Sequence, residues 1–168
     1  MTLPLVGIVM GSDSDLKEMK AAAETLEKFD IAYEMTVASA HRSPDRAAAY
    51  ARTARERGLK VIIAGAGWAA HLAGVLAAAT TLPVIGVPLP SSPLNGWDSL
   101  LATVQMPPGV PVATMALGEG GARNAAILAA QMLALADDDL AARLLVYKKE
   151  MARGVEEKAA GIERRWPA

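Results

Sequence analysis

The chain contains no cysteine among its 168 residues, which excludes disulfide bridges and thiolate chemistry. It also has no excess of charge of one sign, because 17 basic and 18 acidic residues give a formal net charge of −1. Without a broad basic surface, binding to a nucleic-acid backbone is not expected. No apolar run is long enough to span a bilayer, and residues 1–4 lack the pattern of a secretion signal. These absences predict a cytoplasmic protein that does not bind membranes.

What the chain does contain is the composition of an ordinary globular protein, with 52% hydrophobic and 21% charged residues. A domain of this length buries roughly 70% of the surface of its unfolded chain. One hydrophobic core is therefore sufficient. We expect a single domain over residues 1–168, with no internal repeat and no low-complexity linker.

Short β-rich segments alternate with Ala-rich helical segments, which is typical of βαβ units and a parallel sheet. The predicted strands cover residues 5–10, 31–38, 61–64, 84–87 and 112–115. The predicted helices follow these strands, with boundaries near residues 16–29, 44–57, 71–81, 97–104, 122–136 and 138–160. This pattern indicates a three-layer α/β fold of the flavodoxin-like or Rossmann-like kind with a C-terminal helical extension. Ligands of such folds bind at the carboxyl ends of the strands.

The loop after the first strand, Gly11 to Asp15, offers two hydroxyls and backbone amides at a helix N-terminus, which favour a bound phosphate. Because it holds one glycine instead of three in G-x-G-x-x-G spacing, a nicotinamide cofactor is disfavoured. Asp15 would repel a phosphate and is better suited to sugar hydroxyls. An equally valid interpretation is that Ser12 or Asp13 only caps the helix.

The loop after the second strand carries His41 and Arg42, and His41 is one of only two histidines in the chain. An imidazole titrates near neutral pH and can both accept and donate a proton. Arg42 can bind a phosphate or carboxylate with a planar fork of donors. Ser43 and Pro44 have the residue types of an N-cap and a first helical residue. Taken alone, His41 is more often a surface histidine that bonds a backbone carbonyl.

Gly65 and Gly67 follow the third strand, where the lack of side chains would leave backbone amides free to face an anion. Tight packing of the strand against the helix explains the glycines equally well. His71 lies at the start of the next helix, where a structural histidine is the common case. Neither an i, i+4 pair of histidines nor an HxH spacing is present, so no metal site is predicted.

Taken in order along the chain, these motifs resemble those of the N5-carboxyaminoimidazole ribonucleotide mutases of purine biosynthesis, the PurE family. The resemblance extends from Val6 to about Met151. The segments that carry it are Met10 to Asp15, Ser39 to Pro44, Ile62 to Gly67, Ala69 to Leu72, Leu82 to Pro88, Asp98 to Leu101 and Val104 to Pro107. Each is weak alone, but the set in this order is specific.

The resemblance implies a homo-octamer of flavodoxin-like subunits, with active sites close to subunit contacts and the C-terminal helix packed on a neighbour. It implies that His41 is the catalytic acid and base and that His71 is a second active-site histidine near the migrating carboxylate. The implied substrate-binding residues are Ser12, Ser14, Asp15, Ser39, Arg42, Gly65, Gly67 and Leu72. No cofactor is implied, and the enzyme would act after an ATP-dependent carboxyaminoimidazole ribonucleotide synthase.

The sequence departs from the family pattern at Trp68, where glycine is usual, and at Ala73, where proline is usual. Both residues flank the loop expected to hold the carboxylate. Two other functions stay open at this point. One is an aminoimidazole ribonucleotide carboxylase that uses free carbon dioxide, and the other is a non-catalytic ligand-binding module. A receiver domain would need an aspartate at Gly65, and a flavin-binding protein would need a longer hydroxyl-rich loop.

Overall fold

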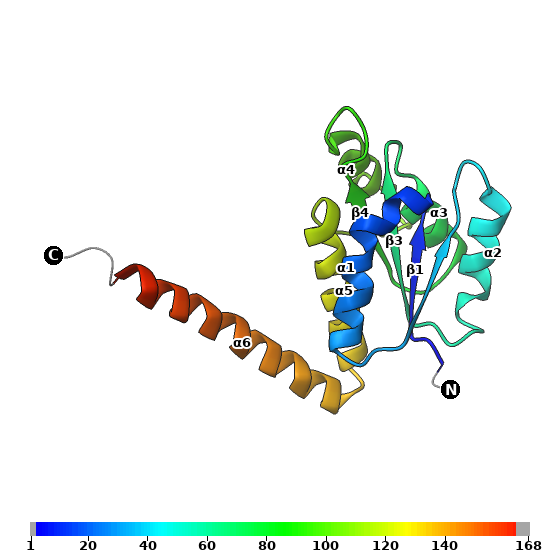
Figure 1. The fold of residues 1–168 in the computed structure, drawn as a ribbon. Helices are drawn as coiled ribbons and strands as arrows, with labels where there is room; N and C mark the ends of the chain where they lie inside the picture. The colour runs from blue at the N-terminus through cyan, green and yellow to red at the C-terminus, as the bar shows by residue number, and fades with distance from the viewer. Residues whose placement is uncertain (1–2, 164–168) are drawn as a thin grey trace. The chain divides into compact units, whose positions relative to one another are not determined.

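A five-stranded parallel sheet forms the centre of the fold in the computed structural model, which describes residues 3–163 (Figure 1). The strands are β1 (Val6–Met10), β2 (Tyr33–Val37), β3 (Val61–Gly67), β4 (Val84–Leu89) and β5 (Ala113–Thr114). Their order in the sheet is β2-β1-β3-β4-β5, and every neighbouring pair is parallel. This order is that of the flavodoxin-like sheet, so the predicted fold class is confirmed.

Helices connect the strands, as the alternating sequence pattern predicts. They are the 3-10 turn η1 (Asp13–Asp15) and the α-helices α1 (Leu16–Lys28), α2 (Pro44–Ala54), α3 (Leu72–Ala79), α4 (Trp97–Val104), α5 (Gly118–Ala134) and α6 (Asp138–Glu163). The element between β4 and β5 is short because Pro107, Pro108 and Gly109 interrupt the chain after α4.

The sheet is covered on both faces, which explains why its inner strands are almost entirely apolar. On one face, Val9, Ile62 and Ala64 pack with buried alanines and leucines of α2 and α3. Met19 of α1 lies against the other face, beside Gly65. β1 and β4 are fully buried, whereas the edge strand β2 is half-buried and alternates in polarity, as its sequence predicts.

The chain forms two compact units, one ending at Ala129 and the other beginning at Ala130. The first unit holds the whole sheet. In the second, Asp137 accepts a hydrogen bond from the Leu140 amide at 2.9 Å, at the start of α6. The helix expected near residues 138–160 is present as α6. The expectation of one domain and the packing of this helix on a neighbouring subunit stay predictions.

Two boundaries and one capping bond near the expected site differ from the predicted ones. β3 continues through Gly67 instead of ending at Ala64, and α2 ends at Ala54 instead of at Arg57. Ser43 occupies the N-cap position of α2, but its hydroxyl makes no capping bond. It bonds the backbone of Ser39 instead. Within residues 3–163, no helix is long and apolar enough to cross a membrane.

Candidate active site

A cavity of about 540 Å³ lies at the carboxyl ends of the first three strands of the sequence. The loops after β1, β2 and β3 provide most of its lining, and Ser91 adds a side chain from the loop after β4. Parallel strands end at the same edge of a sheet, so residues far apart in sequence meet here. The lining residues are Gly11, Ser12, Ser14, Asp15, Ser39, Ala40, His41, Arg42, Ala66, Gly67, Trp68, Ala69, His71, Leu72 and Ser91.

The first loop turns directly into η1 through a capping box. Asp15 Oδ2 accepts a hydrogen bond from the Ser12 amide at 3.0 Å, and the Ser12 hydroxyl accepts one from the Ser14 amide at 3.4 Å. The Ser12 and Ser14 hydroxyls are 3.0 Å apart and hydrogen-bonded. The Ser12 hydroxyl also donates to Asp13 Oδ1 at 3.0 Å, so its own donor and acceptor sites are used within the loop. The exposed Ser14 hydroxyl keeps acceptor capacity for a ligand.

Asp15 is a buried carboxyl group in the wall of this cavity, with a residue exposure of 6%. Burial raises the pKa of Asp15 above its ordinary value of 3.8, because desolvation disfavours the charged form. The hydrogen bond from the Ser12 amide opposes this rise, and the Arg42 guanidinium opposes it more weakly. The carboxyl group is fixed by the backbone while still facing the cavity, as a hydrogen-bond acceptor for hydroxyls requires.

The second loop, between β2 and α2, is held together by its own serines. The Ser43 hydroxyl accepts a hydrogen bond from the Ser39 amide at 3.0 Å, and the Ser39 hydroxyl accepts one from the Arg42 amide at 3.1 Å. The Arg42 guanidinium donates to the Gly11 carbonyl at 3.2 Å, which ties this loop to the first one. A guanidinium has five N–H donors, so Arg42 can also donate hydrogen bonds to a ligand in the cavity.

His41 and His71 meet in the cavity although thirty positions separate them in sequence. His41 Nε2 and His71 Nδ1 are 2.8 Å apart, and the ring centroids are 4.9 Å apart with an interplanar angle of 69°. One nitrogen of this contact carries the hydrogen and the other accepts it, so one hydrogen bond joins the two rings. Both residues are exposed at the cavity surface. The sheet thus joins the only two histidines of the chain.

Known proteins are similar to this chain along most of its length. The AIR carboxylase family matches residues 5–154. The chain belongs to the AIR carboxylase family. An N5-carboxyaminoimidazole ribonucleotide mutase of Bacillus subtilis is 62% identical over 141 residues, which are 84% of this chain and 87% of that protein. The family resemblance expected from the sequence is confirmed.

Two further relatives define the range of the similarity. A phosphoribosylaminoimidazole carboxylase of Schizosaccharomyces pombe is 55% identical over 96% of this chain, but the match covers only 29% of that protein. The crystal structure of Treponema denticola PurE has a TM-score of 0.84 at 28% identity, covering 94% of this chain and 98% of that one. The fold and the family are therefore shared across distant sequences.

Most of the residues expected to bind substrate in this AIR carboxylase family member line the cavity together. Gly65 is the exception, because it is not among the residues that line the cavity. It lies inside β3, outside the cavity lining, where a Cβ would overlap the side chain of Met19. Gly67 does line the cavity, and a Cβ there would overlap the Ser91 hydroxyl. The contact with Met19 requires a glycine at position 65 for packing, whereas the absence of a side chain at Gly67 leaves room for the Ser91 hydroxyl. The role of Gly65 in substrate binding stays a prediction.

Ser91 is a cavity residue that the motif analysis did not single out. Its loop follows the parallel strand β4 and therefore lies at the same edge of the sheet as the other three loops. The position of this loop after a predicted strand was the feature of the sequence that could have identified Ser91 as a cavity residue. The nearby Leu72, expected as a substrate contact, lines the cavity and begins α3.

Trp68 and Ala73, the two departures from the family pattern, differ in their consequences. Ala73 is the second residue of α3, a position that proline also accepts, so the exchange leaves the helix start intact. Trp68 has a φ of 54°, in the left-handed region that favours glycine. Its side chain is 59% exposed and lines the cavity. A tryptophan here is thus strained in its backbone and placed against the ligand volume.

A second hollow of about 390 Å³ adjoins the cavity and shares Ser12, Ser39 and Arg42 with it. It extends the site toward Asp13, Val37 and Ser43. Arg42 therefore lies between two spaces that one extended ligand could fill. Among the residues that the structure describes, no group of three or more His, Cys, Asp or Glu side chains is arranged to hold a metal ion.

Proposed function

We propose that the chain is an isomerase that interconverts N5-carboxyaminoimidazole ribonucleotide and 4-carboxy-5-aminoimidazole ribonucleotide in purine biosynthesis. The observation that carries this proposal is the hydrogen-bonded pair of His41 and His71, which shares its cavity with the hydroxyls of Ser12 and Ser39 and with Arg42. Proton transfer and recognition of an anionic ribonucleotide are the two requirements of this reaction. The similarity to the Bacillus subtilis mutase supports it along most of both chains.

The histidine can perform both proton transfers of the reaction. In the first half, His41 in its protonated form donates a proton to the carbamate nitrogen and becomes neutral, the bond from that nitrogen to the carboxyl carbon breaks, and carbon dioxide is released. In the second half, a carbon of the aminoimidazole ring of the substrate uses its electron pair to form a new bond to carbon dioxide. The proton left on that ring carbon returns to His41. The proton lost in the first half is regained in the second, so no external acid or base is consumed.

His71 orients His41 through the 2.8 Å contact and gives the proton a second nitrogen on which to reside. Two charged rings at this distance would repel each other and lose the hydrogen bond. The pair therefore holds one exchangeable proton at a time, which suits a cycle that moves one proton out and back. No step of this scheme uses a metal ion, a nicotinamide, biotin or ATP.

The polar residues around the pair suit the rest of the substrate. We assign the phosphate to the space between Arg42, Ser12 and Ser39, where a guanidinium and two hydroxyls converge on both hollows. We assign the ribose hydroxyls to Asp15, whose carboxyl oxygens accept hydrogen bonds. Ser14 and Gly67 border these positions, and Leu72 supplies an apolar surface near His71.

Release of free carbon dioxide requires a site from which water is excluded. In the isolated chain His41 and His71 are exposed, so something must cover them during turnover. We propose that this cover is a neighbouring subunit of a homo-octamer. Trp97, Leu101 and Val104 of α4 are 67%, 50% and 49% exposed, as apolar side chains of an assembly interface would be in a separated chain. A cytoplasmic location and supply of substrate by an ATP-dependent synthase complete the proposal.

A carboxylase that takes free carbon dioxide is the second candidate, because the Schizosaccharomyces pombe carboxylase is also similar over nearly the whole chain. Purified protein mixed with the carbamate substrate, and separately with aminoimidazole ribonucleotide plus bicarbonate, distinguishes the two activities. Rapid product formation from the carbamate supports the mutase. Rapid formation only in the second mixture would replace it with the carboxylase, and no product in either would favour a non-catalytic binding module.

A further inference from the structure

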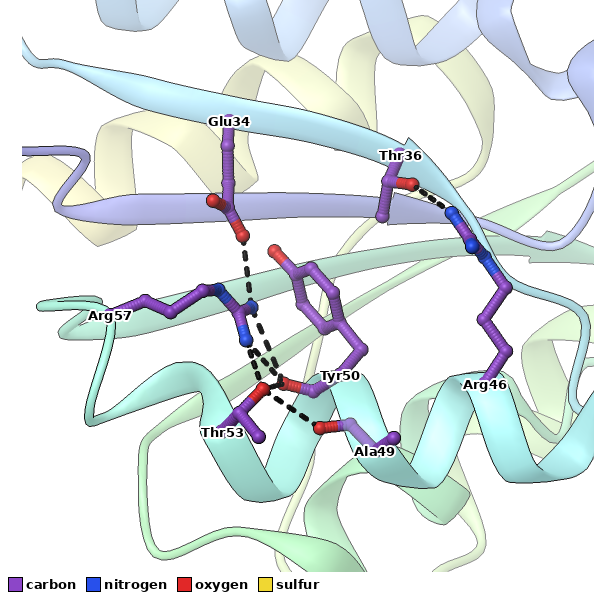
Figure 2. A network of polar contacts seen from close by, with 7 residues as sticks. All are labelled: Glu34, Thr36, Arg46, Ala49, Tyr50, Thr53 and Arg57. Atoms are coloured by element: carbon purple, nitrogen blue, oxygen red, sulfur yellow. Dashed lines mark hydrogen bonds and ion pairs between the residues drawn. The ribbon is translucent and has the colours of Figure 1, made fainter.

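The geometry points to Arg46 as a positioning residue for the catalytic histidine pair, which we propose as a role beyond the reaction scheme above. Arg46 lies in the first turn of α2 and does not line the cavity. Its guanidinium donates from Nε to the Val37 carbonyl at 2.9 Å and from Nη2 to the Thr36 hydroxyl at 3.0 Å. It thereby joins the two ends of the loop that carries His41 and Arg42 (Figure 2).

The Val37 carbonyl is an acceptor that the sheet itself does not use. The Ala38 amide donates to Met10 of β1 at 2.9 Å, and the carbonyl and amide of one peptide unit point in opposite directions. The Val37 carbonyl therefore points away from β1, toward the open edge of the sheet. Among residues 3–163, β2 is the edge strand on that side of the sheet. Arg46 occupies the position that a neighbouring strand would otherwise fill.

The need for such a tie follows from the exposure of the histidine pair. His41 and His71 are both exposed, so packing of the rings in a core does not fix their distance. The loops that carry them must do so. The His71 loop lies between β3 and α3, and β3 is an inner strand paired on both sides. The loop that carries His41 connects the edge strand β2 to α2, so the position of His41 depends on how firmly α2 is held to β2.

A guanidinium meets this requirement better than an ammonium group. Its planar fork donates in two fixed directions at once, and here the two acceptors belong to consecutive residues at the end of β2. Both acceptors are neutral, so the contact specifies geometry without forming an ion pair with the catalytic region. A lysine could reach one of the two acceptors at a time.

A second arginine provides an internal control, because it ties α2 to the same strand far from the loop. Arg57, three residues after α2 ends, donates from Nη2 to Glu34 Oε1 at 3.0 Å and bonds the Tyr50 carbonyl at 3.4 Å. Its guanidinium also lies 4.5 Å from the Tyr50 ring centroid. Figure 2 shows Arg46 and Arg57 reaching β2 from opposite ends of the helix. Loss of either contact weakens the packing of α2, but only Arg46 borders the catalytic loop.

The test compares Arg46→Met with Arg57→Met in protein labelled with nitrogen-15 at histidine. Only two histidines exist in the chain, so every imidazole signal reports on the pair. In Arg46→Met the ring signals of His41 and His71 should move toward those of separate imidazoles and lose the hydrogen-bonded N–H resonance. In Arg57→Met these signals should stay unchanged even though the unfolding temperature falls. Thr36→Val, which removes one of the two bonds, should move the signals less in the same direction and covers the case in which Arg46→Met does not fold.

The kinetic part of the test depends on the proposed mutase activity. We expect Arg46→Met to lower kcat about tenfold to a hundredfold with a smaller change in KM, because misplacement of a catalytic group by about 1 Å costs this much. Arg57→Met should retain kcat. Unchanged ring signals in both Arg46→Met and Thr36→Val, or equal changes in the Arg57 variant, would overturn the role of Arg46. If the wild-type protein does not turn over the carbamate, the mutase proposal fails while the nuclear magnetic resonance comparison still decides the role of Arg46.

Discussion

His41 gives and takes the one proton of the proposed cycle, so the effect of its removal is specific. His41→Asn keeps a side chain of similar size with hydrogen-bonding atoms but removes proton transfer. We expect kcat to fall by about 10² to 10⁴, the range typical of a general acid or base. Nucleotide affinity and the free energy of unfolding should change little. Steady-state kinetics and urea unfolding measure these effects, and retention of turnover would remove His41 from its role.

Asp15 couples substrate binding to the pH dependence of stability. Burial raises its pKa in the folded state, so the folded protein holds this proton more tightly than the unfolded chain. Its contribution to stability is therefore greatest below the ordinary pKa of 3.8 and declines as pH rises through the higher folded value. Asparagine does not ionise. The free energy of unfolding of Asp15→Asn minus that of wild type should therefore increase between about pH 4 and about pH 7, which means that the variant gains relative stability.

The same Asp15→Asn variant should bind substrate less well at neutral pH. A hydrogen bond to a charged group contributes about 1.5 to 3 kcal/mol, so KM should rise about tenfold or more. Urea titrations at the two pH values and steady-state kinetics measure both effects on one protein. A relative stability that falls with rising pH would show that the carboxyl group is stabilised in its charged form.

Trp68 combines backbone strain with a place in the cavity wall, and Trp68→Gly separates these properties. A left-handed conformation costs a residue with a Cβ about 1 to 2 kcal/mol. The greater freedom of glycine in the unfolded chain offsets roughly 0.4 to 1 kcal/mol. We expect a net gain in the free energy of unfolding of up to about 1 kcal/mol. Turnover should rise as the cavity widens.

Ala69→Gly is the matched control for Trp68→Gly, because Ala69 lines the same cavity without a positive φ. Ala69→Gly should lower the free energy of unfolding, because glycine increases the conformational entropy of the unfolded chain and relieves no backbone strain at this position. Chemical denaturation of both variants gives the comparison. Destabilisation by Trp68→Gly as large as that by Ala69→Gly would mean that the indole contributes contacts that outweigh the strain.

At the scale of secondary structure elements, the packing of α2 on the sheet contains an unsatisfied group. The buried Tyr50 hydroxyl has no hydrogen-bond partner, and it lies where a Cβ on Gly7 of β1 would otherwise be. Burial, and then the nearby Glu34 carboxylate, raise the pKa of Tyr50 above its ordinary value of 10.0. The hydroxyl is therefore protonated and neutral near neutral pH.

Removing this hydroxyl should stabilise the protein. Tyr50→Phe should increase the free energy of unfolding by about 1 kcal/mol, because a buried polar group without a partner costs about 1 to 3 kcal/mol. Thr25→Val is the control, since the buried Thr25 hydroxyl donates to the Ala21 carbonyl at 2.6 Å and its loss should destabilise. Denaturant unfolding gives both values. A clear loss of stability in Tyr50→Phe would show that the hydroxyl is satisfied in solution.

The elements themselves were largely predictable from sequence, whereas their ends and side-chain bonds were not. Alternation of apolar strands with Ala-rich helices predicted the sheet, and α4 has the expected bounds of Trp97 and Val104. Glycines after Ala64 suggested a loop, but pairing with β4 extends β3 through Gly67. Ser43 had the right residue type for a capping bond, yet Ser39 provides closer partners for its hydroxyl. Such choices depend on tertiary contacts, which local patterns do not contain.

At the scale of the whole molecule, the parallel sheet accounts for the composition of the site. The loops that follow β1, β2, β3 and β4 lie at one edge of the sheet. They bring together Asp15, His41, His71 and Ser91, which are distant in sequence. The family resemblance predicted that both histidines belong to one site, but their direct hydrogen bond could not be read from the sequence. Equally, the exposure of the pair indicates that the single chain does not complete the dry environment that the reaction requires.

The central claim is that the carboxyl carbon is transferred within one enclosed site, and an isotope experiment tests it most directly. The protein is incubated with unlabelled N5-carboxyaminoimidazole ribonucleotide in buffer that contains carbon-13 bicarbonate, and the product is analysed by mass spectrometry. The mutase account predicts rapid product formation with an unlabelled carboxylate. A product that carries the carbon-13 label from its first appearance would show capture of carbon dioxide from solution and would contradict the account.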